Sequence, residues 1–284
     1  MSYITKILDN FDPHKIADSG QAFRIHSIDD THVELVAKGR YLQIADLGED
    51  EFAFSCDEAE FNDIWIPFFD LDTDYKKIIR SIDKGDTYLR DAAVYGKGIR
   101  ILRQDIFEMV ISYIISQRRS IPSITTCVDR LSEKYGKKIK TPKLSSPFIK
   151  PSKDTYYAFP TPDELRDATA EEINSIGAGY RTPYILSAID DFVSGKLDPD
   201  ALSALSDDEL YTVLTSMFGV GIKVANCIML FAFHRCGRFP VDVWMQRIQD
   251  KYYCGSFDCS KYPGTAGIMQ QFMFFYERTE DSHK

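Results

Sequence analysis

Residues 206–253 hold two apolar helical segments joined by a short glycine turn, and this arrangement restricts the possible folds more than any other part of the chain. The first segment begins with Ser206 and Glu209, the hydroxyl and carboxylate of a capping box. Gly219-Val220-Gly221 follows, and the second segment starts directly after it. The pattern predicts a helix-hairpin-helix over about 207–234, whose turn presents backbone N–H groups that can bind a phosphate. An ordinary turn between two helices gives the same pattern, so both interpretations stand at this point.

The N-terminal part of the chain has the period-2 pattern of strands. Apolar and β-branched residues predict strands at 22–25, 32–37, 40–45 and 51–55, with turn residues between them. The sequence therefore predicts a small antiparallel β domain over residues 1–90.

From about residue 74 onward the periodicity becomes helical. Further capping boxes at Thr161–Glu164 and Thr169–Glu172 mark two helix starts. The Lys-, Pro- and Ser-rich stretch 137–154 is predicted to be a surface loop. The chain as a whole is predicted to be α+β, with a mainly helical body over residues 91–284 behind the β domain. The predicted helices cover 103–117, 120–135, 162–168, 170–176, 181–195, 207–216, 222–234, 242–252 and 265–277.

Charge is unevenly distributed along the chain. The net charge of −9 argues against a nucleic-acid ligand, because proteins that bind nucleic acid are usually basic on at least one face. Residues 94–143, however, hold 11 Lys or Arg and only 4 Asp or Glu. This basic segment could form a phosphate-binding surface, and a solvated charged helix is the alternative.

Composition argues against several classes of protein. No apolar run approaches the roughly 18 residues that span a bilayer, and residues 1–10 do not resemble a signal peptide. None of the six cysteines forms a C-x-x-C pair, which favours free thiols in a reducing compartment and argues against an iron–sulfur cluster. We expect a cytoplasmic, monomeric protein with no cofactor, no obligate protein partner and no metal needed for its chemistry, while an alkali ion at the hairpin stays open.

The second apolar segment carries a lysine in an unusual place. Lys223, Cys227 and Phe231 are spaced by four residues, so they share one face of the predicted helix. A lysine in the first turn opposes the preference of the helix dipole. The positive helix end and partial burial both favour the free amine, which is the form that acts as a nucleophile. A solvent-facing lysine beside two core residues is the alternative.

An aspartate begins the next predicted helix, in the run Phe239-Pro240-Val241-Asp242. An N-cap is a sufficient structural reason for Asp242. A carboxylate held at a helix start also stays ionised and can stabilise a cationic transition state. Spacing alone does not decide between these two roles.

Together these segments resemble a known signature. Residues 218–227 (FGVGIKVANC) and 239–248 (FPVDVWMQRI) are similar to the helix-hairpin-helix, Gly/Pro…Asp motif of base-excision DNA glycosylases. Within that superfamily the chain resembles the 8-oxoguanine DNA glycosylases over roughly residues 18–277. The other matching motifs, in the family's order, are GQAFR at 20–24, LRQD at 102–105, GYR at 179–181 and AGIMQQFMF at 266–274.

The resemblance implies a bifunctional glycosylase and abasic-site lyase that flips 8-oxoguanine out of duplex DNA. Lys223 occupies the position of the nucleophile, whose amine attacks C1′ and forms a Schiff base that can undergo β-elimination. Asp242 occupies the position that stabilises the developing oxocarbenium ion. Separately from the resemblance, the compact chain and the lack of a recognisable targeting signal favour a prokaryotic cytoplasm, in association with the nucleoid.

The resemblance also implies a pocket that reads the extruded base. The carbonyl of Gly20 would accept the N7–H that 8-oxoguanine has and guanine lacks. Cys227 and Phe274 would sandwich the base, and Gln270 would bond its Watson–Crick edge. Phe231 would line the pocket.

DNA contacts are implied for Gly219, Val220 and Gly221 of the hairpin. Tyr180 and Arg181 would act as wedge and opposite-base contacts.

Three positions depart from the eukaryotic members of the family. Arg118, followed by Arg119 as a further DNA contact, stands where an Asn fills the gap left by the flipped base. Ser123 replaces an Arg that reads the opposing cytosine, and Trp244 replaces a pocket His. We therefore expect weak discrimination of the opposing base.

Three other functions fit parts of the sequence. A glycosylase of the same superfamily for another damaged base is one, although members without a lyase step lack the lysine. A non-catalytic helix-hairpin-helix DNA-binding protein would not need Lys223, Asp242, Gly20 and Gln270 together. A helical scaffold that binds protein is disfavoured by the hairpin and the basic segment.

Overall fold

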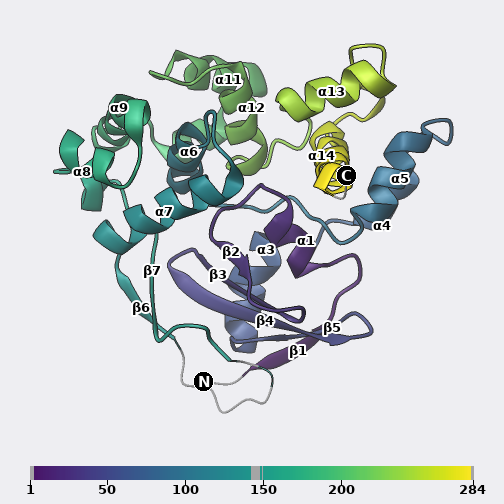
Figure 1. Ribbon diagram of the computed structural model, residues 1–284, viewed down its shortest axis with the longest axis horizontal. Helices are drawn as coiled ribbons and strands as arrows, with labels where there is room; N and C mark the ends of the chain where they lie inside the picture. The colour runs from purple at the N-terminus through teal and green to yellow at the C-terminus, as the bar shows by residue number, and fades with distance from the viewer. Residues whose placement is uncertain (1–2, 142–147, 149, 283–284) are drawn as a thin grey trace.

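The computed structural model describes residues 3–141, 148 and 150–282. A small sheet lies below a helical body (Figure 1), which confirms the predicted α+β fold. The sheet is antiparallel with the order β1-β5-β4-β3-β2. Its strands are β1 (Ile4–Ile7), β2 (Ile25–Ser27), β3 (His32–Ala37), β4 (Arg40–Gly48) and β5 (Glu51–Phe54).

The strand predictions at 32–37, 40–45 and 51–55 are confirmed to within a few residues. The strand predicted at 22–25 begins only at Ile25, because Gln21 is drawn away from the sheet to bond residues 100 and 102. Strand β1 was not predicted, since four residues are too few to show a clear alternation.

One face of the sheet is buried. The β3–β4 register places Val33 opposite Ile44 and Leu35 opposite Leu42, and all four side chains are at most 1% exposed. They pack in one cluster with Trp65 and its neighbours. This cover consists of α2 (Glu58–Glu60), a π-helical turn (Phe61–Trp65) and α3 (Ile66–Phe68).

The helical body confirms most of the predicted helices. Its helices are α4 (Tyr75–Arg80), α5 (Thr87–Tyr95), α6 (Ile106–Ile115), α7 (Ile121–Tyr135), α8 (Ala170–Ser175), α9 (Thr182–Val193), α10 (Pro199–Ala204), α11 (Asp207–Ser216), α12 (Ile222–Phe231), α13 (Val243–Tyr252) and α14 (Ala266–Ser282), while α1 (Pro13–Asp18) lies beside the sheet. The helix predicted at 162–168 is only a 3-10 turn, Asp163–Leu165. The capping boxes of Thr169 and Ser206 are present.

Several short helices were missed. Helices α1, α4, α5 and α10 are six to nine residues long, too short for a clear apolar period. Each begins with an aspartate whose side chain accepts a backbone N–H. The predicted division between residues 90 and 91 stays a prediction, and it falls inside α5, which packs against α14.

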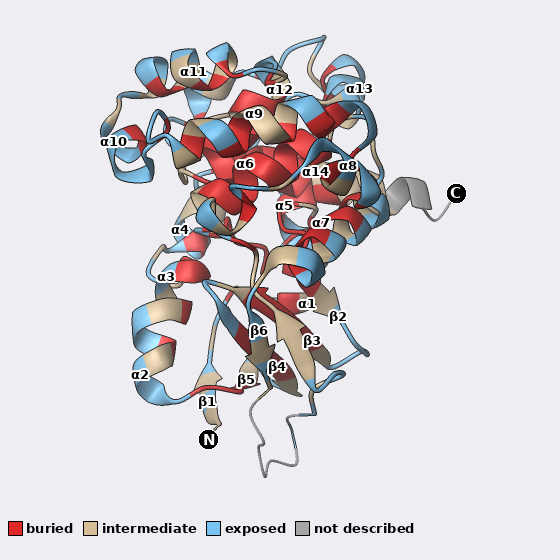
Figure 2. Cartoon of the chain, turned by 90° about the vertical axis from the view of Figure 1, so that its left-hand side faces the viewer, coloured by how far each residue is buried: buried red, intermediate tan, exposed pale blue. Residues whose placement is uncertain are grey.

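Helix α6 forms the centre of the helical body. Every residue from Phe107 to Ile115 is buried, and Figure 2 shows this helix as a red band within the body. Helices α7, α9 and α12 pack against it. The rigid core therefore reaches directly to the elements that carry the candidate site.

The predicted loop 137–154 is partly wrong. Strands β6 (Lys138–Lys140) and β7 (Thr155–Tyr157) pair at its two ends, while 142–147 and 149 lie outside the described residues. Strands of three residues are too short to show a clear alternation in the sequence. The returning segment docks on the sheet, where the Gln43 amide exchanges two hydrogen bonds with the main chain of Lys150, of 2.9 and 2.6 Å.

Within the described part of the chain, no helix has both the length and the apolar character required to cross a bilayer.

Candidate active site and DNA-facing loops

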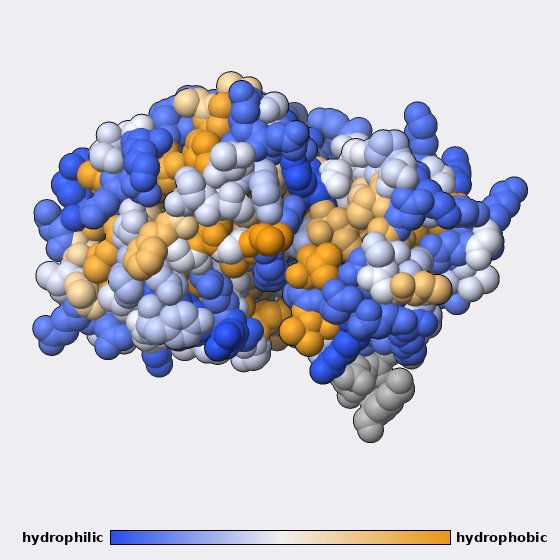
Figure 3. All heavy atoms as spheres, turned by 90° about the horizontal axis from the view of Figure 1, so that it is seen from above, coloured by the Kyte–Doolittle hydropathy of each residue, from blue (hydrophilic) through white to orange (hydrophobic). Residues whose placement is uncertain are grey.

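A recess with an empty volume of about 340 Å³ opens between α6, α12, α14 and the start of α13. Seen from above, the surface is hollowed between the lobe of α9–α12 and the lobe of α13 and α14, and apolar side chains gather along the hollow (Figure 3). All seven residues predicted for catalysis and base binding line the recess. Its lining is Ser19, Gly20, Tyr113, Lys223, Cys227, Phe231, Pro240, Asp242, Gln270, Gln271 and Phe274.

Helix α12 supplies the lysine face. Lys223 lies in the first turn and is half-buried, while Cys227 and Phe231 below it are buried. The predicted placement of these three residues on one side of the helix is therefore correct. Burial raises the pKa of the Cys227 thiol, with the neighbouring Lys223 amine opposing the shift. The thiol thus stays protonated at neutral pH and offers the recess a small neutral surface.

Asp242 faces α12 from the N-cap of α13. Its Oδ1 accepts the backbone N–H of Met245 at 2.9 Å, which confirms the capping role. The same side chain lines the recess with Lys223. The Asp242 carboxylate therefore both caps α13 and lines the recess. The hydrogen bond to the first turn of the helix restricts the motion of its side chain.

The Gly20 segment is fixed by the meeting of two sequence motifs. Gln21 donates from Nε2 to the carbonyl of Arg100 at 2.9 Å, and its Oε1 accepts the N–H of Leu102 at 2.9 Å. Gln104 returns a hydrogen bond of 2.9 Å to the Gln21 carbonyl. Gly20 itself has a φ of +77°, and an added Cβ would lie 3.0 Å from Ile121 Cδ1. A glycine suits this left-handed conformation and close packing.

One carbonyl of this segment is left available. The carbonyls of residues 18, 19 and 21 accept hydrogen bonds from the side chains of Arg278, Gln271 and Gln104. None of the hydrogen bonds that the structure describes uses the carbonyl of Gly20. The segment is thus anchored on both sides of the group that is predicted to read the base.

Helix α14 contributes the opposite wall. The Nε2 of Gln271 donates to the Ser19 carbonyl at 2.6 Å, so this side chain is committed to structure. Gln270 is only 5% exposed, and its Oε1 has no hydrogen-bond partner among the described residues. Phe274 lies beside Gly20, with 3.4 Å from its Cε1 to the glycine's ideal Cβ position. A buried amide with an unpaired oxygen, next to an aromatic face, is an arrangement suited to a planar polar ligand.

Tyr113 is a recess residue that the sequence did not indicate. Its ring stacks on Phe231 with 5.6 Å between centroids and 10° between planes. The Lys223 Nζ lies 5.6 Å from the Tyr113 ring centroid. In sequence Tyr113 belongs to an apolar helical run and is indistinguishable from a core residue, so no local signal marks it.

The hairpin before α12 is packed tightly on α9. Gly219 has a φ of +83°, and an added Cβ would lie 2.3 Å from the Tyr184 ring. Val220 is buried, whereas Gly221 is the N-cap of α12 and provides no side-chain cap. The first-turn N–H groups therefore lack a side-chain acceptor, as expected for a phosphate-binding turn.

The predicted wedge residues differ in exposure. Tyr180 is 54% exposed, whereas Arg181 is only 4% exposed. The Arg181 guanidinium donates to the carbonyls of Ala178 and Gln117 and lies 4.2 Å from the Tyr180 ring centroid. Arg181 thus supports the loop in this state, and a direct contact with the opposing base stays a prediction.

The other predicted DNA-binding arginines follow α6. Arg118 is exposed with a φ of +53°, and Arg119 is half-buried and donates to the Gly177 carbonyl. Ser123 is exposed. Trp244 is not part of the recess lining. The Arg247 guanidinium instead lies over it, with 5.4 Å between the guanidinium carbon and the centroid of the Trp244 ring.

Known proteins are similar to this chain in fold and in sequence. Residues 4–110 match the family model described as 8-oxoguanine DNA glycosylase, N-terminal domain. A crystal structure of the Clostridium acetobutylicum 8-oxoguanine glycosylase/lyase, in complex with dsDNA containing cytosine opposite to 8-oxoG, aligns with a TM-score of 0.88. The two sequences are 31% identical, and the alignment covers 99% of each chain. The chain belongs to the 8-oxoguanine DNA glycosylase family.

Two curated relatives support the assignment to this family. The "Probable N-glycosylase/DNA lyase" of Methanothermobacter thermautotrophicus is 27% identical over 240 residues, which cover 74% of this chain and 72% of the relative. The N-glycosylase/DNA lyase of Saccharomyces cerevisiae is 34% identical over 168 residues, or 55% of this chain and 42% of the relative. The resemblance inferred from sequence motifs is confirmed.

In this family member much of the basic segment 94–143 serves the fold rather than a phosphate surface. Arg100 is buried and donates to the carbonyls of Asn10 and Asp70 at 2.9 and 2.7 Å. Arg103 pairs with Asp70 at 2.9 Å, and Lys134 and Lys137 pair with glutamates 172 and 164. The local charge excess therefore overstates the positive surface that the segment could present to DNA.

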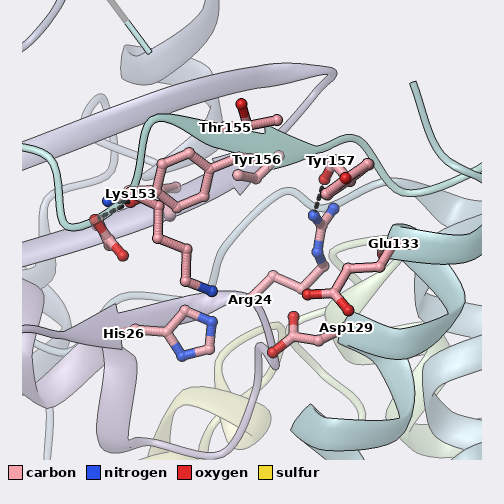
Figure 4. A pocket seen from close by; sticks show the side chains of 12 residues that line it. Arg24, His26, Asp129, Glu133, Lys153, Thr155, Tyr156 and Tyr157 are labelled. Atoms are coloured by element: carbon pink, nitrogen blue, oxygen red, sulfur yellow. Dashed lines mark hydrogen bonds between the residues drawn. The ribbon is translucent and has the colours of Figure 1, made fainter. Parts of the chain in front are cut away.

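A second, polar cavity lies between the sheet, α7 and β7. Figure 4 shows Arg24, His26 and Lys153 around a space that Asp129 and Glu133 of α7 also face. Arg24, the last residue of the GQAFR motif, donates to the Tyr157 carbonyl. This cavity shares no lining residue with the recess, so Arg24 connects the β6–β7 segment to the sheet rather than contributing to the site.

Among the described residues, no group of three or more His, Cys, Asp or Glu side chains is placed to hold a metal ion. All six cysteines are free thiols.

Proposed function

We propose that this chain is a bifunctional DNA glycosylase and abasic-site lyase that removes 8-oxoguanine from duplex DNA. The observation that supports this function most directly is one recess that holds the Lys223 amine, the Asp242 carboxylate, the Gly20 segment and the unpaired amide oxygen of Gln270. These groups supply a nucleophile, a charge stabiliser and two base readers. A DNA-binding module without catalysis would need none of them.

Lys223 is the proposed nucleophile. Its uncharged amine forms a bond to C1′ of the extruded nucleotide as the bond from C1′ to N9 breaks, and the base leaves with the electron pair and takes up a proton. The C1′–O4′ bond of this C1′–amine adduct then breaks, O4′ takes the electron pair and a proton, and a Schiff base remains between C1′ and the amine. Loss of a C2′ proton then breaks the C3′–O bond, and the 3′ phosphate leaves with its electron pair. The ionised Asp242 stabilises the positive charge that builds up on the sugar during base departure.

Gly20 and Gln270 are the proposed base readers. The free carbonyl of Gly20 accepts the N7–H of 8-oxoguanine, whereas guanine would present a lone pair to the same oxygen. One such contact discriminates by roughly 1–3 kcal/mol. Gln270 bonds the Watson–Crick edge, while Phe274 and the neutral Cys227 thiol cover the two faces of the base.

Release of free base tests the proposal. Enzyme in excess over a duplex with 8-oxoguanine opposite cytosine should liberate 8-oxoguanine and then cut the strand at the resulting abasic site. A matched duplex with guanine should stay intact. Release of an alkylated or mismatched base, with 8-oxoguanine left in place, would favour another glycosylase activity of the superfamily. Binding without release of any base would favour a non-catalytic DNA-binding protein.

The setting of this activity is part of the same proposal. The substrate is duplex DNA, and the chain acts as a monomer in a prokaryotic cytoplasm, in association with the nucleoid.

A further inference from the structure

Three loops, one of which is the hairpin, together form a rim on the surface. They are the turn after α6 (residues 116–119), the 3-10 turn Gly179–Arg181 and the hairpin 218–221. Two large side chains on this rim are strongly exposed, Tyr180 at 54% and Phe218 at 59%. Exposed aromatic rings at a DNA-facing rim are suited to stacking on bases.

Gln117 lies where the three loops meet. Its Nε2 donates to the carbonyl of Gly219 in the hairpin at 3.0 Å, and to the carbonyl of Ile114 in its own helix at 3.2 Å. Its main-chain carbonyl accepts the hydroxyl of Tyr180 at 3.5 Å and the guanidinium of Arg181. One residue thus bonds the hairpin through its side chain and the Tyr180 loop through its backbone.

An aromatic row supports the same connection. Phe218 packs edge-on against Tyr184, with 4.8 Å between centroids, and Tyr184 packs edge-on against Tyr180 at 6.3 Å. Gly219 allows this packing because any side chain there would collide with the Tyr184 ring. The row and the Gln117 bonds span the same gap, so the hairpin and the Tyr180 loop cannot shift independently without losing both.

We propose that Gln117 is a positioning residue that holds the helix-hairpin-helix hairpin and the Tyr180 loop in a fixed relative position. Phosphate binding at the hairpin and extrusion of the damaged base by the Tyr180 ring would then occur together. This inference rests on the proposed function. Gln117 reaches no recess residue in the described bonds, and it acts through Tyr180 and the hairpin. Without the Gln117 bonds, phosphate binding at the hairpin would no longer determine how far the Tyr180 ring enters the duplex.

The substitution Gln117→Met keeps the length of the side chain and removes both N–H donors. We expect single-turnover excision of 8-oxoguanine to fall by roughly 10- to 100-fold, because misplacement of positioning groups by about 1 Å costs up to that factor. Duplex affinity should change by less than about threefold, since the hairpin N–H groups remain. The signal of a 2-aminopurine placed beside the lesion should report extrusion slowed by the same factor as excision.

A matched control removes the same kind of bond elsewhere. Gln43→Met loses an amide that ties the distant segment at Lys150 to the sheet, so it should affect stability but not extrusion. Equal loss of extrusion in both variants would show that Gln117 has only a structural role. Extrusion at the wild-type rate in Gln117→Met would also overturn the proposal.

A double variant tests the route through Tyr180. If Gln117 acts by placing that ring, Tyr180→Ala and the double variant Gln117→Met/Tyr180→Ala should lose excision to the same extent, whereas additive losses would contradict the inference. Wild-type protein that releases no 8-oxoguanine at all would instead remove the proposed function itself, so the two failures are distinguishable.

Discussion

The amine of Lys223 lies 5.6 Å from the ring centroid of Tyr113, whose other neighbours in the recess include the stacked ring of Phe231. The Tyr113 hydroxyl donates to the carbonyl of Gln21 at 3.3 Å. Tyr113 thus connects the proposed nucleophile with the segment that carries Gly20. An aromatic face beside the amine restrains its position by contact and offers it no strong hydrogen-bond acceptor.

The Tyr113 ring and its hydroxyl should therefore have separable effects. Tyr113→Phe keeps the ring and loses one hydrogen bond worth about 1 kcal/mol of stability, so single-turnover excision should stay within about threefold of wild type. Tyr113→Leu removes the ring from beneath Lys223 and should lower excision by roughly tenfold or more, with a loss of about 2–4 kcal/mol in unfolding free energy. Equal rates in the two variants would show that the ring has no positioning role.

Asp242 should matter for chemistry more than for folding. Asparagine is as good an N-cap as aspartate, so Asp242→Asn should leave the urea midpoint nearly unchanged. Base excision should fall by roughly 10²-fold or more, because the charge that stabilises the sugar cation is lost. Near-normal excision in this variant would return Asp242 to a capping role alone.

The sequence predicted the Lys223 face of α12 because that face depends on local periodicity. Lys223, Cys227 and Phe231 share one side of a helix whatever the tertiary structure, and Asp242 is marked by its helix start. Gly20 and Gln270 were placed only through the family resemblance. Nothing in their spacing shows that residues 250 positions apart line one recess.

Tertiary contacts account for what the sequence missed. Tyr113 and Gln117 acquire their roles from partners on other helices and loops, so no motif marks them. The burial of Arg181 depends on carbonyls that the fold brings within reach. Basic residues such as Arg100 were counted as available charge, although the fold buries them against main-chain oxygens.

Glu108 should make stability depend on pH. It is 8% exposed, and burial raises its pKa to about 7, with the Arg24 cation opposing the shift. Since the pKa is higher in the folded state than in the unfolded chain, the folded protein binds this proton more tightly. The resulting stabilisation is present below about pH 4.5 and is lost as pH rises to about 7, a change of about 3 kcal/mol.

The isosteric variant Glu108→Gln measures this effect. It cannot ionise, so its unfolding free energy should exceed that of wild type at pH 8 and approach it at pH 5. Urea titrations of both proteins at the two pH values give the comparison. A difference that does not change between pH 5 and pH 8 would mean that Glu108 is not protonated in the folded state.

Discrimination of the opposing base should be weak. The exposed Ser123 cannot extend the bidentate fork that an Arg offers to a base, and losing one such contact costs about 1–3 kcal/mol of selectivity. Single-turnover excision from four duplexes that differ only opposite 8-oxoguanine should show a modest preference for cytosine. Ser123→Arg should increase it. A wild-type preference above roughly a thousandfold, or about 4 kcal/mol, would mean that another residue reads the opposing base.

The central claim is that Lys223 forms the covalent bond to DNA. Borohydride reduction during reaction with an 8-oxoguanine duplex should give a stable protein–DNA adduct with wild-type protein. The control Lys196→Gln removes an exposed lysine that pairs with Asp191 and should give the same adduct. Lys223→Gln should bind the duplex and give no adduct, whereas an adduct formed by Lys223→Gln at the wild-type level would contradict the account.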